Sequence, residues 1–124
     1  MRSVLALIAA ACLTYVNNMA IAHHSFATQY DADAPITLTG KVTKVEWLNP
    51  HARFYVDVED PNGSVVNWNL ELASPNVLRR NGWSRNALKV GDEVNVEGSL
   101  ARDGSKMANA RTVTLADGTQ VFAR

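Results

Sequence analysis

From residue 36 onward, the chain alternates short runs of β-forming residues with turn signals. In the run ITLTGKVTKVEWLNPH, Leu38 and Val42 occupy positions of one parity. The next apolar residues, Val45 and Trp47, occupy the other parity. Because side chains alternate between the two faces of a strand, this change predicts one long strand that is bent by a bulge or a glycine kink within residues 40–44. Strong bending of this kind is typical of a small barrel.

Two further runs are joined by a hairpin loop. HARFYVDVED and SVVNWNLEL flank Pro61-Asn62-Gly63, in which proline presets φ and glycine accepts the left-handed conformation. Placing Asp60 opposite Ser64 brings all the apolar partners to one face, which predicts the register of both strands. The apolar pairs are Val58 with Val66, Val56 with Trp68, Phe54 with Leu70 and Ala52 with Leu72. The pairs on the opposite face are Asp57 with Asn67, Tyr55 with Asn69, Arg53 with Glu71 and His51 with Ala73.

The segment after this hairpin has the capping residues of a short helix. In ASPNVLRRNGW, Ser74 can cap the helix, Pro75 suits its first turn and Gly82 can end it. The runs LKVGDEVNVEGSLAR and MANARTVTLADG predict a fourth and a fifth strand, with TQVFAR as a short addition. This order resembles the OB-fold, so we expect an all-β protein with one short helix, folded as a small five-stranded OB-like barrel over residues 36–124. Another small β-barrel or an open sandwich would also satisfy the pattern.

The first 22 residues have the features of a secretory signal peptide. Arg2 forms a positive n-region, residues 4–16 form an apolar h-region, and Ala20-Ile21-Ala22 is a small-x-small cleavage site. A membrane anchor is the alternative, but the apolar run is shorter than the roughly 20 residues that a span needs. A lipoprotein signal ending at Cys12 is a weaker alternative, because the residues before it lack the usual large apolar side chain. We therefore expect export to the periplasm with cleavage after Ala22, which leaves residues 23–35 as an N-terminal extension of the barrel.

Composition and charge narrow the set of partners. Processing removes Arg2 and the only cysteine, so the 12 basic and 12 acidic residues of the full chain become 11 and 12, and no disulfide can form. A near-neutral charge offers little attraction for a polyanion, so we expect no nucleic-acid partner, and we expect no membrane span after processing. Trp47, Trp68, Trp83 and Phe54 could form a base-stacking platform. The hydrophobic pattern instead favours packing in the core, because Trp68 and Phe54 lie on the apolar face.

Candidate metal ligands are concentrated in three histidines. After cleavage, His23 would carry a free α-amine beside its own imidazole, so its amine nitrogen and ring Nδ1 could chelate one metal ion. A further imidazole, from His51 or from His24, would complete a three-nitrogen set, and tetragonal nitrogen ligation favours Cu(II). This arrangement resembles the histidine brace of periplasmic copper-binding proteins and of lytic polysaccharide monooxygenases, which also begins at a mature N-terminal histidine.

Other residues add little to this metal hypothesis. A second amino-terminal copper motif needs histidine at mature position three, which is Ser25 here. Candidate outer or axial groups are Tyr30, Asp31, Asp33 and Met107. Histidines in a chain terminus or beside a turn are, taken singly, more often solvated or structural.

No motif indicates catalysis, and we expect no enzyme. The sequence has neither a carboxylate–histidine spacing for hydrolytic zinc nor a glycine-rich phosphate loop. The leading hypothesis is a small periplasmic metal-binding protein that binds or delivers copper. The alternative is an OB-like module that binds a ligand or another periplasmic protein, without metal, through the face formed by Arg53, Tyr55, Asn69 and Glu71.

Several segments together resemble a known family. AHHSFATQYD, LTGKVTKVEWLNPHARFYVDVED, NWNLELASPNVLRRNGW and LKVGDEVNVEG are similar to a bacterial exported family of domains of unknown function, number 6152. The resemblance covers nearly the whole mature chain, and its most specific parts are His-His-Ser-Phe, Asn-Pro-His and the Gly-Trp to Gly-Asp segment. It implies export and a small β-domain but supplies no activity, so the functional hypotheses rest on the site.

Overall fold

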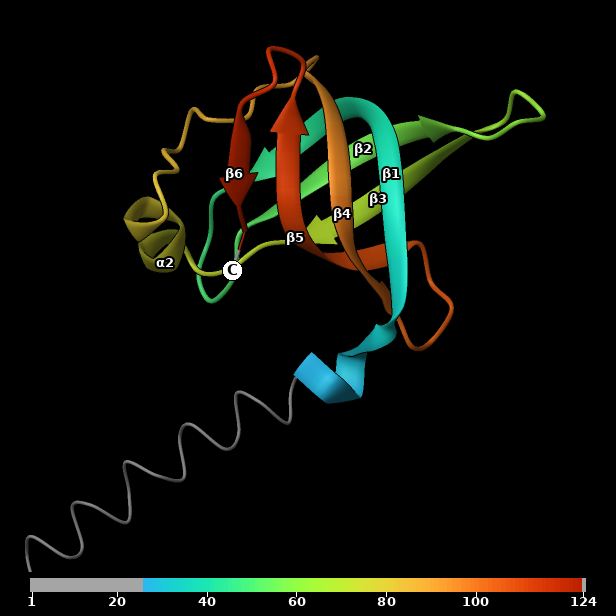
Figure 1. The fold of residues 1–124 in the computed structure, drawn as a ribbon, viewed down its shortest axis with the longest axis horizontal. Helices are drawn as coiled ribbons and strands as arrows, with labels where there is room; N and C mark the ends of the chain where they lie inside the picture. Colours follow the sequence, from blue (N-terminus) through green and yellow to red (C-terminus); the bar gives the residue numbers. More distant parts are fainter. Residues whose placement is uncertain (1–25, 124) are drawn as a thin grey trace, which may run out of the picture.

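The computed structural model describes residues 26–123, which form one strongly bent sheet and a short helix (Figure 1). A helical turn at residues 26–29 leads into the first strand. The elements are β1 (Tyr30–Glu46), β2 (Arg53–Glu59), β3 (Val65–Glu71), α2 (Pro75–Arg80), β4 (Glu93–Ala101), β5 (Met107–Leu115) and β6 (Gln120–Phe122). The expected order of three strands, a helix and two strands is confirmed, and β6 is the short addition. β1 begins at Tyr30, earlier than the expected start at Ile36.

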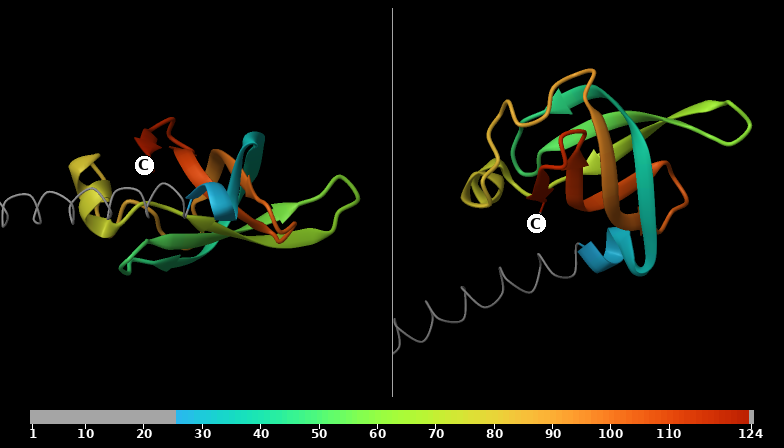
Figure 2. Two further views of the ribbon diagram at one scale, coloured as in Figure 1. Left: turned by 90° about the horizontal axis from the view of Figure 1, so that it is seen from below. Right: turned by 45° about the horizontal axis from the view of Figure 1, so that its top comes forward.

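The sheet closes into a barrel because β1 pairs with two different neighbours. Its first part pairs with β4 and its last part with β2, and its register shifts between Val42 and Lys44. This bulge lies where the sequence predicts a bend. Gly40 allows β1 and β2 to approach closely, since a Cβ atom built there would lie 2.3 Å from the carbonyl oxygen of Asp57. A parallel pairing of β3 with β5 closes the ring, and β6 lies beside β5 (Figure 2).

The β2–β3 hairpin has the register that the sequence predicts. The hydrogen bond from Asp60 N to Ser64 O, 2.7 Å long, fixes its loop. The polar pairs Asp57–Asn67, Tyr55–Asn69 and Arg53–Glu71 and the apolar pairs Val58–Val66, Val56–Trp68 and Phe54–Leu70 are all present. The apolar face fills the barrel, whereas the end of the hairpin that carries the loop projects beyond it (Figure 1).

α2 lies at the end of the molecule opposite the tip of this hairpin (Figure 1). Ser74 Oγ accepts a hydrogen bond from Val77 N at 3.4 Å, and the chain leaves the helix through Gly82, whose φ is +90°. Leu78 and Trp83 are buried in the core together with Trp68, and Trp47 packs against it. The interpretation of the tryptophans as core residues is therefore confirmed. Within residues 26–123, no helix is long and apolar enough to cross a membrane.

Candidate functional site

Glu71, at the end of β3, is the centre of a polar cluster on the outside of the barrel. Strand alternation places it on the outer face, yet only 4% of the residue is exposed. Its carboxylate accepts hydrogen bonds from Tyr30 Oη at 2.7 Å and from Arg53 Nη2 at 2.6 Å. His51 Nδ1 lies 2.7 Å from the other carboxylate oxygen. A carboxylate can be buried in this way because charged and polar donors replace its water.

Three separate parts of the chain bring these donors to Glu71. The hairpin register places Arg53 directly opposite it. His51 lies in the loop between β1 and β2, just before Arg53. Tyr30 begins β1, and its ring packs against that of Phe26 in the preceding helical turn, with 5.7 Å between the centroids. The sequence predicts only the Arg53 contact, because Tyr30 and Glu71 are 41 positions apart and no local pattern links them.

The Tyr30 hydroxyl acts as a hydrogen-bond donor to Glu71 over the whole physiological pH range. The residue is 1% exposed. Burial raises the pKa of this hydroxyl far above its ordinary value, and the neighbouring Glu71 carboxylate raises it further, against a smaller opposing effect of Arg53. The protonated hydroxyl therefore holds the start of β1 against the end of β3.

His51 is the half-exposed member of the cluster. Its side chain is 49% exposed, whereas that of its partner Glu71 is 5% exposed. Because Nδ1 faces the carboxylate, the neutral ring carries its proton on Nδ1 and keeps its lone pair on Nε2. Histidines that bind metals usually donate their other ring N–H to a carboxylate in the same way. The cluster thus fixes the orientation of one imidazole.

The four residues expected to form an interaction face are brought together. Arg53 Nη1 donates to Asn69 Oδ1 at 3.3 Å, in addition to its contact with Glu71. Tyr55 Oη donates to Glu46 Oε2 at 3.3 Å. Arg53, Tyr55 and Asn69 are half-buried and border solvent, while Glu71 lies beneath them. Side-chain hydrogen bonds therefore connect Arg53, Asn69 and Glu71, while Tyr55 lies opposite Asn69 in the hairpin and bonds to Glu46.

The two other histidines lie outside the described residues. These are His23 and His24, on which the metal hypothesis depends. Within residues 26–123, no three side chains of histidine, cysteine, aspartate or glutamate are grouped as metal ligands would be. The described part of the chain therefore supplies His51 as an oriented imidazole and no complete metal site.

The candidate outer ligands have other partners. Asp31 Oδ1 lies 3.4 Å from Arg102 Nη2 and accepts a hydrogen bond from Asp33 N at 3.1 Å. Met107 is half-buried on β5, opposite Asn69 of β3. Tyr30 alone among these candidates contacts the carboxylate that holds His51.

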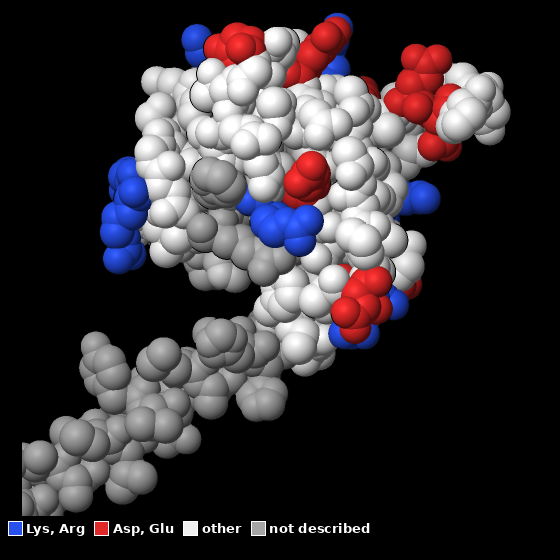
Figure 3. Space-filling view, in the orientation of Figure 1, with Lys and Arg blue, Asp and Glu red and all other residues white. Residues whose placement is uncertain are grey.

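Two segments of the chain each carry charge of one sign. Residues 72–91 contain no acid and four cations, which are Arg79, Arg80, Arg85 and Lys89. Residues 54–68 contain no base and three acids, which are Asp57, Glu59 and Asp60. Basic side chains gather at the α2 end in Figure 3 and acidic ones along the hairpin. In the described part of the chain, none of the four cations lies within salt-bridge distance of an acid.

The architecture defines the chain as an OB-fold domain. Two crystal forms of the mitochondrial single-stranded DNA-binding protein Rim1 from S. cerevisiae match it with a TM-score of 0.51 each, at 15% and 13% identity. The matches cover 67% of this chain and 94% and 92% of Rim1. The N-terminal domain of PriB from Thermoanaerobacter tencongensis matches with a TM-score of 0.42 at 21% identity, over 68% of this chain and 97% of that domain. The Rim1 likeness supports the fold expected from the sequence.

The chain belongs to the Family of unknown function (DUF6152), whose family model matches residues 10–110. This membership confirms the family resemblance that the sequence motifs indicate. No curated protein matches the chain. The family assigns no activity, so its description adds nothing to the choice between a metal site and an interaction face.

The exclusion of nucleic acid as a partner is wrong. It rests on the near-zero net charge, but the solved structures of Rim1, which has the same fold, are of a single-stranded DNA-binding protein. The physical reason for the error is that a sum over the chain conceals the segregation of its charges. The cationic segment at residues 72–91 is separate from the acidic hairpin, so net charge does not measure local attraction for phosphate.

Proposed function

We propose that the protein is an exported, periplasmic metal-binding protein that binds copper through its processed N-terminus and His51. The observation that carries this proposal is the 2.7 Å contact between His51 Nδ1 and the buried carboxylate of Glu71. It fixes an exposed imidazole with Nε2 available as a ligand. One imidazole is a weak site by itself, so the proposal requires further nitrogen ligands from the N-terminal segment.

The start of the folded domain supports this choice of ligands. Tyr30, the first residue of β1, donates to the same carboxylate that holds His51. Phe26, whose ring packs against Tyr30, follows His23 by three positions in the sequence. Three residues of chain span at most about 11 Å. Cleavage after Ala22 would therefore leave the new α-amine near the end of the barrel where His51 lies.

The proposed ligand set is the amine and Nδ1 of His23 with Nε2 of His51. His24 is the alternative source of an imidazole. Three nitrogen ligands in a tetragonal arrangement favour Cu(II), which also has the highest affinity in the divalent series. The proposed role is binding and delivery of the ion rather than catalysis.

The test compares processed protein with a form that keeps one additional methionine before His23. We expect the processed form to bind one Cu(II) ion with a nitrogen-rich tetragonal electron paramagnetic resonance spectrum. The extended form, whose His23 amine is in a peptide bond, should bind at least 100-fold more weakly. His51→Gln and His24→Gln in the processed protein separate the two imidazoles. Equal affinity of the processed and extended forms would contradict the proposal.

A metal-free binding module is the second candidate, and the local charge favours single-stranded nucleic acid as its ligand. Rim1, which shares the fold, is described as a single-stranded DNA-binding protein. The cationic segment at residues 72–91 supports attraction of phosphates. Tyr55, with Lys44 Nζ 5.3 Å from its ring centroid, supports contact with a base on the interaction face.

Fluorescence anisotropy with a labelled oligothymidylate tests this candidate in the presence of EDTA. We expect binding that weakens steeply with added salt, as phosphate contacts do. The double variant Arg79→Gln/Arg80→Gln should bind the oligothymidylate at least 10-fold more weakly. The matched control Lys41→Gln/Lys106→Gln removes the same charge elsewhere, so its affinity should fall less. Absence of binding at low salt would remove nucleic acid from consideration. A metal-independent protein ligand would instead perturb Arg53, Tyr55 and Asn69.

A further inference from the structure

The projecting part of the β2–β3 hairpin leaves one strand edge without a partner. Asn69 N donates to Lys106 O at 3.0 Å, so the backbone groups of Asn69 point away from β2. In an antiparallel pair, the backbone N–H and C=O groups of every second residue point to the same side of the strand. Those of Asn67 and Val65 therefore also point away from β2. The pairing with β5 begins only at Asn69. In the described part of the chain, the outward N–H and C=O groups of Val65 and Asn67 therefore face an open edge (Figure 2).

The two faces of this hairpin differ in character. Asp57 and Glu59 are exposed on the outer face, and neither forms an ion pair among the described residues. Asp57 is held in place by a 2.8 Å hydrogen bond from Asn67 Nδ2. Val58 and Val66 lie on the inner face, partly buried against the core. A strand added beside β3 would therefore lie next to Val65 and Asn67 on the outer face, with the acids Asp57 and Glu59 one strand further away, and next to apolar side chains on the inner face.

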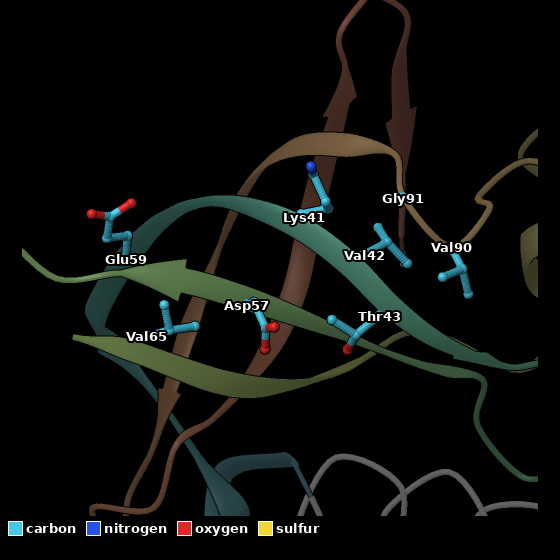
Figure 4. A pocket seen from close by; sticks show the side chains of 8 residues that line it. All are labelled: Lys41, Val42, Thr43, Asp57, Glu59, Val65, Val90 and Gly91. Carbon is cyan, nitrogen blue, oxygen red and sulfur yellow. The ribbon is translucent and has the colours of Figure 1, made fainter. Parts of the chain in front are cut away.

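A groove of about 430 Å³ lies on the outer face over β1 and β2, and Val65 of β3 lines its side toward the open edge (Figure 4). Val65 and Val90 contribute two apolar walls and are 60% and 68% exposed. The loop that carries Val90 is fixed to β1, because Gly91 N donates to Val42 O and Val42 N donates to Asp92 O, both at 2.8 Å.

Carboxylates outnumber cations around the groove. Asp57 and Glu59 belong to its lining, together with one cation, Lys41. The acid Asp60 follows at the hairpin loop. Residues 54–68 contribute no positive charge. The groove therefore complements a cation that has an aliphatic stem, such as a lysine or arginine side chain.

We propose that the open edge of β3 binds an extended basic segment of a partner protein, which joins the sheet as an additional strand. Backbone hydrogen bonds to Val65 and Asn67 hold the segment, as in other cases of strand addition. Its lysine or arginine side chains, at alternate positions, extend across β3 past Val65 and reach Asp57 and Glu59 at the groove. Its intervening apolar side chains extend the inner face of the hairpin. A second copy of this hairpin is disfavoured, because it would bring like charges together.

Nuclear magnetic resonance of the isotope-labelled protein tests this proposal with two peptides. The first is Thr-Lys-Val-Lys-Val-Lys-Val-Thr, and the second has glutamate in place of each lysine. We expect saturable shifts of the Val65 and Asn67 amide signals with the lysine peptide and at least 10-fold weaker binding of the glutamate peptide. The double variant Asp57→Asn/Glu59→Gln should bind the lysine peptide at least 5-fold more weakly, and this binding should depend less on salt.

Two substitutions at one position separate the backbone from the side chain. Val65→Pro removes an N–H that points away from β2, whereas Val65→Ala keeps it. We expect the proline variant to bind the lysine peptide at least 10-fold more weakly and the alanine variant less than 3-fold. If Val65→Pro fails to fold, the glutamate peptide and the carboxylate variant still decide the matter. Equal binding of both peptides, or shifts of these amides on protein dilution that indicate self-association, would overturn the proposal.

Discussion

His51 Nδ1 and Glu71 Oε1 lie 2.7 Å apart, which connects a half-exposed imidazole to an almost completely buried carboxylate. The same carboxylate accepts hydrogen bonds from Tyr30 and Arg53. The orientation of His51 therefore depends on residues from three strands. Substitutions in this cluster should change both the stability of the barrel and the proposed metal affinity.

Glu71→Gln should lower both the stability of the barrel and the proposed affinity for Cu(II). An amide has a single oxygen, so its N–H₂ group must face either His51 or the Tyr30 and Arg53 donors, and we expect the free energy of unfolding to fall by about 1–3 kcal/mol. Loss of the carboxylate behind a ligating histidine typically lowers metal affinity about 10- to 100-fold. Urea unfolding and Cu(II) titration measure the two effects. Glu97→Gln, at an exposed position on β4, is the matched control and should alter neither.

Tyr30→Phe should change the dependence of stability on alkaline pH. The native state raises the pKa of Tyr30 above its ordinary value of 10.0, so this contribution to stability is present below pH 10 and is lost as the pH rises through the native pKa. The wild-type protein should therefore lose up to about 1.4 kcal/mol per pH unit above pH 10 from this group. Denaturant unfolding at pH 9 and pH 11 should show a smaller loss for the variant. An identical loss in both proteins would contradict this role.

Gly40→Ala should disrupt the place where β1 passes from one neighbour to the other. Its Cβ would lie 2.3 Å from the carbonyl oxygen of Asp57, so the two strands must separate. We expect destabilisation of about 3 kcal/mol, at the upper end of overpacking effects. Thermal unfolding measures the change, and Thr37→Ala, at an exposed position on the same strand, is the control. A melting temperature unchanged by Gly40→Ala would show that the strands can separate at this point without loss of stability.

Ser74→Ala should remove the N-terminal cap of α2. Ser74 Oγ accepts from Val77 N, and loss of such a cap typically costs about 1 kcal/mol. Urea unfolding should detect this decrease, with Ser84→Ala at an exposed position as the control. A comparable loss in the control would mean that the cap is not its cause.

The sequence predicts the features of this fold that arise from neighbouring residues. The loop at Pro61-Asn62-Gly63 and the alternation around it determine the complete register of β2 and β3. The parity change after Val42 locates the bulge in β1. Both depend on interactions within one strand or between two consecutive ones, which local periodicity records.

Contacts between distant parts of the chain are the ones that the sequence does not reveal. Arg53 opposite Glu71 follows from the hairpin, but the burial of Glu71 depends on Tyr30, which arrives from the other end of β1. The parallel pairing of β3 with β5 has no local signal either. Summed charge likewise gives no information on how cations and acids are distributed over the folded surface.

The pairing that closes the ring consists of the three residue pairs Asn69–Met107, Leu70–Ala108 and Glu71–Asn109. So short a seam is a natural place for local opening, and Glu71 is part of it. Opening there would separate Glu71 from Tyr30, which pairs with β4, whereas His51 and Glu71 would stay together on the β2–β3 side. The closed ring and the burial of the Glu71 carboxylate therefore form one cooperative unit. A partner that opened this pairing would expose the carboxylate to water without touching His51.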